Sequence, residues 1–169
     1  MAECTLRKAL PQELPICMEI LSSGREFQRA QGFVQWADGY PDSATVERDL
    51  LSGDGWFLCV DGAPAGYFYL GFTEDPSYPL IKGAWRYDGA YAVVHRIAIG
   101  SAYRGQGLTG ETFRLIGELA LSRGVEILRI DTLEENLRMR HVVEKNGFAY
   151  CGTVIQSGGD RMAFDKKLN

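Results

Sequence analysis

The chain has 169 residues, of which 46% are hydrophobic and 24% are charged, and its formal net charge at pH 7 is −4. This length and composition predict one globular domain over residues 1–169, large enough to form a core without disulfides or metals. The acidic balance argues against general nucleic-acid binding, which needs a basic surface, and no apolar run approaches the roughly 18 residues of a membrane span.

The first half of the chain predicts a strand, two helices and a hairpin. A short strand is expected at Thr5–Ala9, followed from Pro11 by a helix whose apolar residues recur at the spacing of one buried face. The segment 42–53 predicts a second helix, capped by its first Asp or Ser and ended by its last Gly. Asp61-Gly62 between two apolar runs is a strong signal for a β-hairpin.

The second half predicts helices and strands around one central strand. Residues 73–90 are too irregular to assign, whereas 91–99 (YAVVHRIAI) is apolar on both sides and predicts a buried central strand. A glycine turn, a helix from Leu108, a strand at 126–132, a helix at 136–147 and two final strands follow. We therefore expect an α/β (α+β) fold, with a mixed sheet of about six or seven strands flanked by about four helices.

The stretch YRGQGLTGETF carries glycines at 105, 107 and 110 in the spacing G-x-G-x-x-G. A glycine turn that opens a helix presents free backbone N–H groups and the positive end of the helix dipole, which together favour an anion. A dinucleotide-binding fold would explain the spacing and Asp131 about twenty residues later. However, GSAYR separates the strand from Gly105, and too few βα units follow. Two interpretations of the glycine spacing remain: a phosphate site of another kind, or a tight turn that needs glycine only for its backbone conformation.

Two motifs in this order resemble those of the GNAT superfamily of acetyl-CoA-dependent N-acetyltransferases. RGQGLT (Arg104–Thr109) is similar to the family motif Q/R-x-x-G-x-G/A, and NLRMRHVVEKNGF (Asn136–Phe148) to N-x-x-A…Y-E-K-x-G-F. The resemblance is specific over about residues 91–153, and the chain looks most like small bacterial GNAT proteins of unassigned substrate. It implies transfer of the acetyl group of acetyl-CoA to a primary amine of a small molecule or to an amino-terminal group.

The resemblance also implies where acetyl-CoA binds. The pyrophosphate would lie on the amides of the glycine loop, the pantetheine arm beside the end of the central strand, and one asparagine would touch the coenzyme. The residues implied are Ile97, Ala98, Ile99, Arg104, Gly105, Gln106, Gly107, Leu108, Thr109, Gly110 and Asn136. Thr109 departs from the family, which usually has Gly or Ala there, so we expect a reshaped site.

His95 is the candidate general base, because imidazole exchanges protons near neutral pH and because arylalkylamine acetyltransferases resemble this arrangement on the same strand. The alternative is a core histidine hydrogen-bonded across the sheet. Val143 occupies the position of the family's tyrosine and cannot donate a proton. Tyr150, Cys151 or a water are the candidate general acids, unless the thiolate leaves unassisted.

The acceptor pocket is predicted from aromatic residues in loops. Trp36 and Tyr40 in VQWADGYP form a candidate wall for the acceptor, although such residues can equally fix their loop to the core. An aromatic pocket favours a small acceptor that is partly apolar or cationic. Further candidates to line or charge the pocket are Tyr78, Trp85, Tyr87, Asp38, Asp42 and Asp88.

The sequence also allows alternative functions and supports expectations about metals, thiols and location. Val143 favours a coenzyme A-binding sensor or a degenerate domain with little activity, and a protein acceptor also stays open. The four cysteines include no C-x-x-C pair and there are two histidines, so we expect no metal, reduced thiols and a cytoplasmic protein. The N-terminus lacks the apolar segment of a signal peptide. Dimers are common in the resembled family, which leaves a homodimer open.

Overall fold

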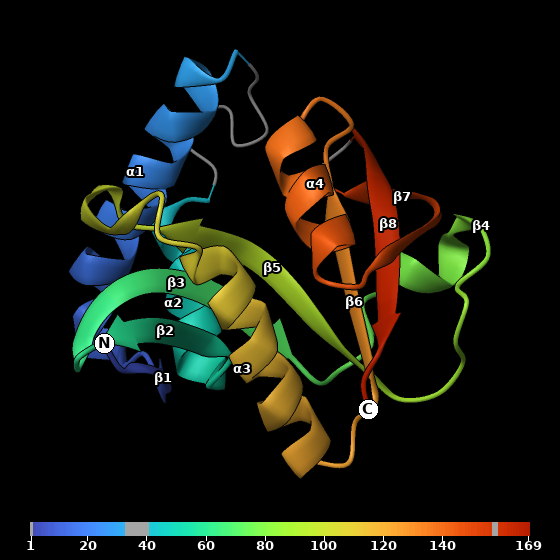
Figure 1. Ribbon diagram of the computed structural model, residues 1–169, viewed down its shortest axis with the longest axis horizontal. Helices are drawn as coiled ribbons and strands as arrows, with labels where there is room; N and C mark the ends of the chain where they lie inside the picture. The colour runs from blue at the N-terminus through green and yellow to red at the C-terminus, as the bar shows by residue number, and fades with distance from the viewer. Residues whose placement is uncertain (1, 33–40, 157–158) are drawn as a thin grey trace. The chain divides into compact units, whose positions relative to one another are not determined.

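The computed structural model describes residues 2–32, 41–156 and 159–169 (Figure 1). These residues fall into two compact units, Met1–Leu70 with Arg96–Leu115, and Gly71–His95 with Ile116–Asn169. Strand β5 (Tyr91–Ile99) and helix α3 (Leu108–Ser122) each begin in one unit and end in the other. That residues 1–169 act as one domain therefore stays a prediction.

The fold is a mixed sheet with four α-helices in the described residues, which confirms the predicted fold class. The order of hydrogen-bonded strands is β1-β2-β3-β5-β6-β8-β7-β4, eight strands where about six or seven were expected. The remaining helices are α1 (Leu14–Ala30), α2 (Ser43–Ser52) and α4 (Leu137–Lys145), with single 3-10 turns at η1 (Pro11–Glu13), η2 (Tyr78–Leu80) and η3 (Ser101–Tyr103). The remaining strands are β1 (Cys4–Lys8), β2 (Gly55–Val60), β3 (Ala63–Gly71), β4 (Lys82–Gly83), β6 (Ile127–Thr132), β7 (Ala149–Gln156) and β8 (Gly159–Lys167).

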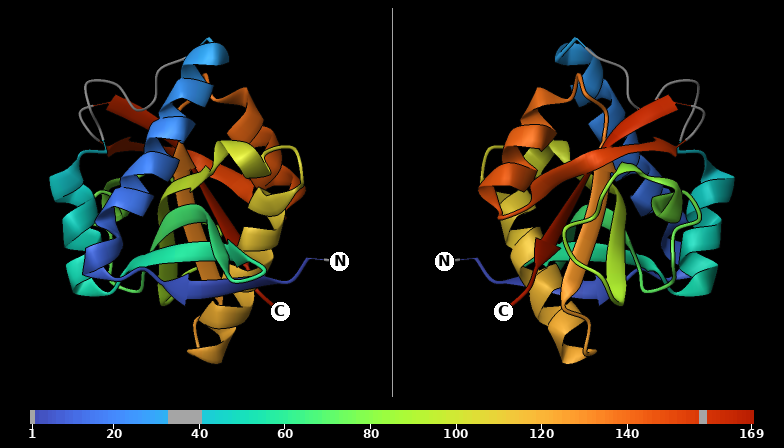
Figure 2. Two further views of the ribbon diagram at one scale, coloured as in Figure 1. Left: turned by 90° about the vertical axis from the view of Figure 1, so that its left-hand side faces the viewer. Right: turned by 90° about the vertical axis from the view of Figure 1, so that its right-hand side faces the viewer.

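In the first unit, antiparallel β1, β2 and β3 carry α1 and α2 on one face (Figures 1 and 2). Asp61 and Gly62 both have positive φ, 49° and 84°, which is the backbone of a two-residue hairpin turn and confirms that prediction. The apolar side chains of the helices pack against Phe57 and Cys59 of β2 and Tyr67 of β3. The buried cluster consists of Ala9, Cys17, Ile20, Leu21, Val46, Leu50, Phe57, Cys59, Tyr67 and Ala98.

Helix α2 begins and ends where the sequence indicated. The Asp42 carboxylate accepts a hydrogen bond of 2.8 Å from the Thr45 N–H, which satisfies one of the free amides of the first turn. Gly53 ends the helix with φ 78°, a conformation that costs glycine little. The predicted helix from Pro11 is a 3-10 turn that leads into α1.

In the second unit, β5 pairs in parallel with β6, which pairs antiparallel with β8, and β8 with β7. The extra strand is β4, two residues paired with β7 inside the segment 73–90 that the sequence left unassigned. So short a strand has no alternating pattern to read. Gly147, with φ 90°, follows the end of α4 as predicted.

Among the described residues, no helix has the length and apolar character needed to cross a membrane.

Candidate active site

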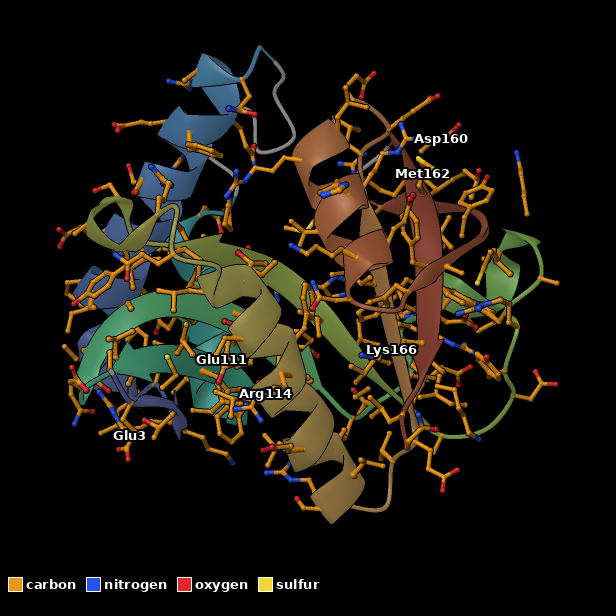
Figure 3. The ribbon with its side chains drawn as sticks, in the orientation of Figure 1. Glu3, Glu111, Arg114, Asp160, Met162 and Lys166 are labelled. Carbon is orange, nitrogen blue, oxygen red and sulfur yellow. The ribbon has the colours of Figure 1, made fainter. Side chains whose placement is uncertain are left out.

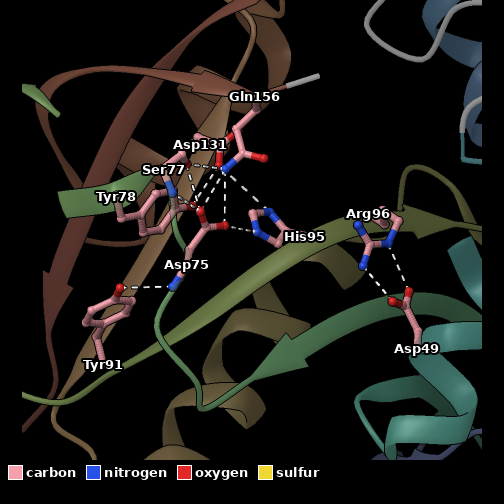
Figure 4. A network of polar contacts seen from close by, with 9 residues as sticks. All are labelled: Asp49, Asp75, Ser77, Tyr78, Tyr91, His95, Arg96, Asp131 and Gln156. Atoms are coloured by element: carbon pink, nitrogen blue, oxygen red, sulfur yellow. Dashed lines mark hydrogen bonds and ion pairs between the residues drawn. The ribbon is translucent and has the colours of Figure 1, made fainter. Parts of the chain in front are cut away.

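His95, near the middle of β5, lies in a polar cluster of the second unit (Figure 4). Its Nε2 is 2.9 Å from Oδ2 of Asp75, and its Nδ1 is 3.8 Å from Oδ2 of Asp131. The three side chains are 17%, 12% and 6% exposed, respectively. The imidazole thus has a carboxyl group next to each ring nitrogen, in surroundings that are largely shielded from water.

The Asp75 carboxylate is held by several donors besides His95. The Ser77 N–H and hydroxyl donate to Oδ1 at 2.9 and 2.7 Å, and the Gln156 amide donates to both oxygens at 3.1 Å. The Asp75 N–H itself donates to the Tyr91 hydroxyl at 3.1 Å. Burial alone would favour the neutral acid, but hydrogen bonds from His95 and Ser77 outweigh it and hold the pKa of Asp75 below its ordinary value. Asp75 is therefore an anchored, ionised carboxylate.

Asp131, on β6, has a different environment. Its Oδ2 accepts a hydrogen bond of 2.7 Å from the hydroxyl of Tyr78, a side chain that is fully buried. Burial raises the pKa of Asp131 above its ordinary value, although the nearby His95 and the Tyr78 hydroxyl act in the opposite direction. The pKa values of the two carboxyl groups beside His95 are thus shifted in opposite directions, that of Asp75 down and that of Asp131 up.

Aromatic packing holds the segment that carries Asp75. The Tyr78 and Trp85 rings are 4.9 Å apart, and the Trp85 indole N–H donates to the Tyr78 carbonyl at 2.9 Å. The guanidinium of Arg129 lies 4.2 Å from the Trp85 ring and 4.0 Å from the ring of Tyr91. Of the two predicted pocket residues, Tyr78 is therefore fully buried with its ring centroid 6.2 Å from that of His95, and Trp85 is partly buried against Tyr78.

Arg96, directly after His95, has φ +51° although it is not glycine. In the first unit, its guanidinium makes a two-point ion pair with Asp49 of α2, at 2.9 and 2.6 Å, and lies over the Tyr69 ring (Figure 4). The Tyr67 hydroxyl donates to the same carboxylate at 2.7 Å. A left-handed conformation of a residue other than glycine costs on the order of 1–3 kcal/mol, so the surrounding contacts must stabilise Arg96 in it.

The predicted phosphate loop lies in the first unit. Gly105 and Gly107 have φ 79° and 71°, and a Cβ on either would meet no other atom within 4 Å. Glycine is thus required here by backbone conformation, not by crowding. Both residues and Gln106 are exposed, and α3 begins at Leu108, so the loop leads into a helix N-terminus. This arrangement suits an anion.

Two side chains that were predicted to contact the coenzyme, Arg104 and Asn136, make hydrogen bonds to other parts of the protein. Nη2 of Arg104 donates to the carbonyl and the hydroxyl of Ser23, both at 2.7 Å, and the guanidinium lies 4.5 Å from the Phe27 ring of α1. Asn136 caps α4, where its Oδ1 accepts from the Met139 N–H at 3.1 Å. Contact of either side chain with a coenzyme stays a prediction, as it does for Ile97 to Ile99 at the end of β5.

The candidate acids lie on β7, away from Gln156. Tyr150 is 53% exposed and its ring makes a T-shaped contact with that of Phe164, and the pKa of Cys151 is raised by burial. Five positions of extended strand, about 16 Å, separate Cys151 from Gln156, which binds Asp75. The structure therefore does not bring either residue to His95, and a role as general acid stays a prediction.

The remaining candidates have varied positions. Trp36, Tyr40 and Asp38 lie outside the described residues, Asp42 caps α2, and Asp88 is exposed. Val143 is fully buried, while His141 is exposed on α4. Within residues 2–32, 41–156 and 159–169, no group of three or more His, Cys, Asp or Glu side chains is arranged to hold a metal ion.

Comparison with known proteins now identifies the class. The model of the acetyltransferase (GNAT) family matches residues 21–148 of this chain. The chain therefore belongs to the GNAT family of acetyltransferases and is an acyltransferase. No curated protein sequence matches it.

Solved structures agree with this assignment. A GNAT family acetyltransferase from Streptococcus agalactiae is 32% identical, with a TM-score of 0.88 over 98% of this chain and 96% of that one. One from Listeria monocytogenes is 20% identical, with a TM-score of 0.77 over 98% and 95% of the two chains. AAC(6')-Ib, in a complex with paromomycin and acetyl-CoA, is 21% identical, with a TM-score of 0.71 over 98% and 93%. The last two show the shared fold alone.

Proposed function

We propose that this protein transfers the acetyl group of acetyl-CoA to a primary amine of a small molecule or to an amino-terminal group, with His95 as the general base. The observation that carries the proposal is the imidazole between two carboxyl groups, on the strand that leads into the glycine loop. Histidine is the side chain that most often acts as a general base in enzymes.

Acetyl-CoA would bind through the glycine loop. The backbone amides of Gly105 to Gly110, of which residues 105–107 are exposed, and the N-terminus of α3 are the groups that would receive its pyrophosphate. Thr109 keeps its N–H and adds a hydroxyl to the same turn. The pantetheine would run beside Ile97 to Ile99, whose backbone N–H groups would stabilise the oxyanion of the reacting thioester.

In the reaction, the amine nitrogen gives a proton to His95 and forms a bond to the acetyl carbon. The C–S bond then breaks and coenzyme A leaves as a thiolate, which takes up a proton from solvent or from a general acid. Tyr150 and Cys151 remain the proposed acids. A thiol with an ordinary pKa of about 8.5 is a tolerable leaving group without help.

A small amine is the proposed acceptor, in line with AAC(6')-Ib, whose structure holds paromomycin. Trp36 and Tyr40 remain proposed walls of its pocket. We also propose a cytoplasmic location, since Cys4, Cys17, Cys59 and Cys151 are free thiols, and a single domain over residues 1–169, with a homodimer open. A protein acceptor is the alternative for the same chemistry.

The second candidate function is a coenzyme A-binding sensor with little activity. Val143 favours it, because a fully buried valine replaces the usual proton donor of the family. In that case the glycine loop would bind acetyl-CoA and His95 would serve only the packing of the second unit.

To test the proposal, the purified protein is incubated with acetyl-CoA and a panel of polyamines, amino acids, arylalkylamines, aminoglycosides and short peptides. Mass spectrometry then looks for an added acetyl group, and thermal shift measures coenzyme binding. An acetylated product from one amine class supports the enzyme. Thermal stabilisation by acetyl-CoA without any product supports the sensor, and stabilisation by NAD instead would overturn both.

A further inference from the structure

We propose that Arg104 is a positioning residue, which fastens the entrance of the glycine loop to helix α1 and so fixes the backbone amides that would receive the pyrophosphate of the coenzyme. This inference rests on the proposed function for its consequence on coenzyme binding. It assigns a role to Ser23 and Phe27 of α1, which belong to neither of the two motifs in the sequence. The fastening itself can be measured without a ligand or a reaction.

The contacts of Arg104 with α1 are of two kinds. Its Nη2 donates to the carbonyl and to the hydroxyl of Ser23, both at 2.7 Å, which matches the two hydrogens that this nitrogen carries. The same guanidinium lies 4.5 Å from the centroid of the Phe27 ring, one helical turn after Ser23. Donation through a planar fork and stacking on an aromatic ring are properties that lysine does not share. The two residues of α1 thus restrain both the direction and the plane of the guanidinium.

The residues directly after Arg104 have little packing of their own. Gly105, Gln106 and Gly107 are exposed, and a Cβ on either glycine would meet no other atom within 4 Å. Glycine also loses more backbone freedom on folding than any other residue, so an ordered glycine turn has to be held at its ends. The position of these amides therefore depends on the residues that flank them.

Hydrogen bonds fix the chain on both sides of this turn. Before it, the Gly100 N–H donates to the Ala65 carbonyl of β3 at 2.7 Å, and the 3-10 turn η3 leads from Gly100 to Arg104. After it, the Glu111 N–H donates to the Gly107 carbonyl at 3.2 Å, where α3 begins. The Arg104 side chain ties the residue before the first glycine to a third element, α1. Its contacts lie closer along the chain to the exposed amides than the bond to β3 does.

The alternative is the role that the family resemblance implies, in which the charge of Arg104 contacts the coenzyme itself. The two roles differ in what they require of the side chain. A charge that binds phosphate would be replaced largely by lysine, and its effect would not depend on Phe27. A residue that fastens the loop depends on the guanidinium fork and on the ring beneath it, so lysine would not replace it.

The first test uses the protein without a ligand. Nitrogen-15 relaxation of backbone amides reports motion on the picosecond to nanosecond time scale, and the amides of residues 105–107 are the probes. In Arg104→Gln and in Phe27→Leu we expect the heteronuclear NOE of these amides to fall, while the values in α3 stay unchanged. Amides that are equally mobile in the wild type and in both variants would overturn the proposal.

The second test measures the dissociation constant of coenzyme A by calorimetry. Arg104→Gln, Arg104→Lys and Phe27→Leu should each weaken binding by about tenfold, because the loop then has to be ordered on binding. The double variant that combines Phe27→Leu with Arg104→Gln should lose no more than Arg104→Gln alone, since both changes remove the same contact. The matched control is Arg114→Gln, which removes an exposed arginine of α3 that pairs with Glu111 and should keep the wild-type affinity.

Two outcomes of the calorimetry would contradict the fastening role. Wild-type affinity in both Arg104→Lys and Phe27→Leu would show that the charge alone matters. Additive losses in the double variant would show that the two side chains act separately. If coenzyme A binds to none of the proteins, wild type included, the proposed function fails, and the relaxation measurement still decides whether Arg104 fastens the loop.

Discussion

Arg96 and Asp49 show how a single residue can shape the strand that carries the candidate base. Asp49 is 5% exposed. Its carboxylate accepts hydrogen bonds from the Tyr67 hydroxyl and from two nitrogens of the Arg96 guanidinium. Buried ion pairs contribute little net stability compared with apolar replacements, but removing one partner leaves the other charge buried without compensation. Removal of either partner of this pair is therefore expected to destabilise the protein.

This arrangement predicts that Asp49→Ala lowers the free energy of unfolding by about 3–5 kcal/mol, because Arg96 loses its buried partner. Urea denaturation followed by circular dichroism measures the change. Tyr67→Phe, which removes only one donor to the same carboxylate, should cost about 1 kcal/mol. A loss below 1 kcal/mol for Asp49→Ala would mean that the fold does not depend on Asp49 to compensate the charge of Arg96.

Neither Asp49 nor Asp75 could be recognised from the sequence. Asp49 lies in a helix among other charged residues, and Asp75 lies in the irregular segment 73–90, so only the fold reveals what each contacts. His95 could be chosen as the candidate base because its strand and the motif after it are local patterns, and its role stays a prediction. Long-range partners leave no local pattern, which is why the candidate site was predicted only in part.

Among the helices and strands, the local sequence was sufficient to predict those positions where a turn or a helix cap requires a particular type of residue. Asp42, Gly53, the Asp61-Gly62 turn and Gly147 all occupy the positions predicted for them. Strand β4 was missed because its two residues pair with β7 only through tertiary packing. Polar surface contacts such as the Glu111–Arg114 pair on α3 (Figure 3) follow the helical spacing and add little stability.

The glycine loop gives a prediction at this scale. Gly107→Ala forces a Cβ onto a residue with φ 71°, which costs about 1 kcal/mol and places a methyl group beside the amides that would receive phosphate. We expect coenzyme A affinity, measured by calorimetry, to fall at least about tenfold.

The control for Gly107→Ala is Gly62→Ala. Gly62 has a similar φ of 84° and equally open space around the new Cβ, but it lies in the hairpin turn. It should lose similar stability and keep coenzyme affinity. Equal affinity losses in both variants would show that backbone strain alone explains the effect, and would remove the loop from the binding site.

For the whole molecule, carboxyl groups with shifted pKa values make the free energy of unfolding depend on pH. The pKa values of Asp75, Glu13 and Glu111 are held below their ordinary values in the folded state, Asp75 by the hydrogen bonds that outweigh burial, and Glu13 and Glu111 by hydrogen bonds from Arg7 and Arg114. A carboxyl group whose pKa is lowered by folding stabilises the folded state at pH values above its pKa in the unfolded chain. This contribution is lost as the pH falls. Asp131, with a raised pKa, acts in the opposite sense.

The Asp75 contribution predicts a pH-dependent difference between wild type and Asp75→Asn. At pH 7 the wild type should be the more stable, and the difference should shrink as pH falls below about 4, where the unfolded carboxyl takes up its proton. Urea unfolding of both proteins from pH 7 to pH 3 measures it. A difference that stays constant over this range would show that the ionised form of Asp75 is not what the fold stabilises.

The central claim is that His95 takes the proton of an amine during acetyl transfer, and one measurement tests it most directly. The initial rate of amine-dependent coenzyme A release is compared for wild type, His95→Gln and His141→Gln across pH 6 to 9. We predict that His95→Gln loses at least about 100-fold in kcat. His141→Gln, in which the exposed histidine is replaced, should match the wild type. Equal rates and equal pH profiles for wild type and His95→Gln would contradict the account.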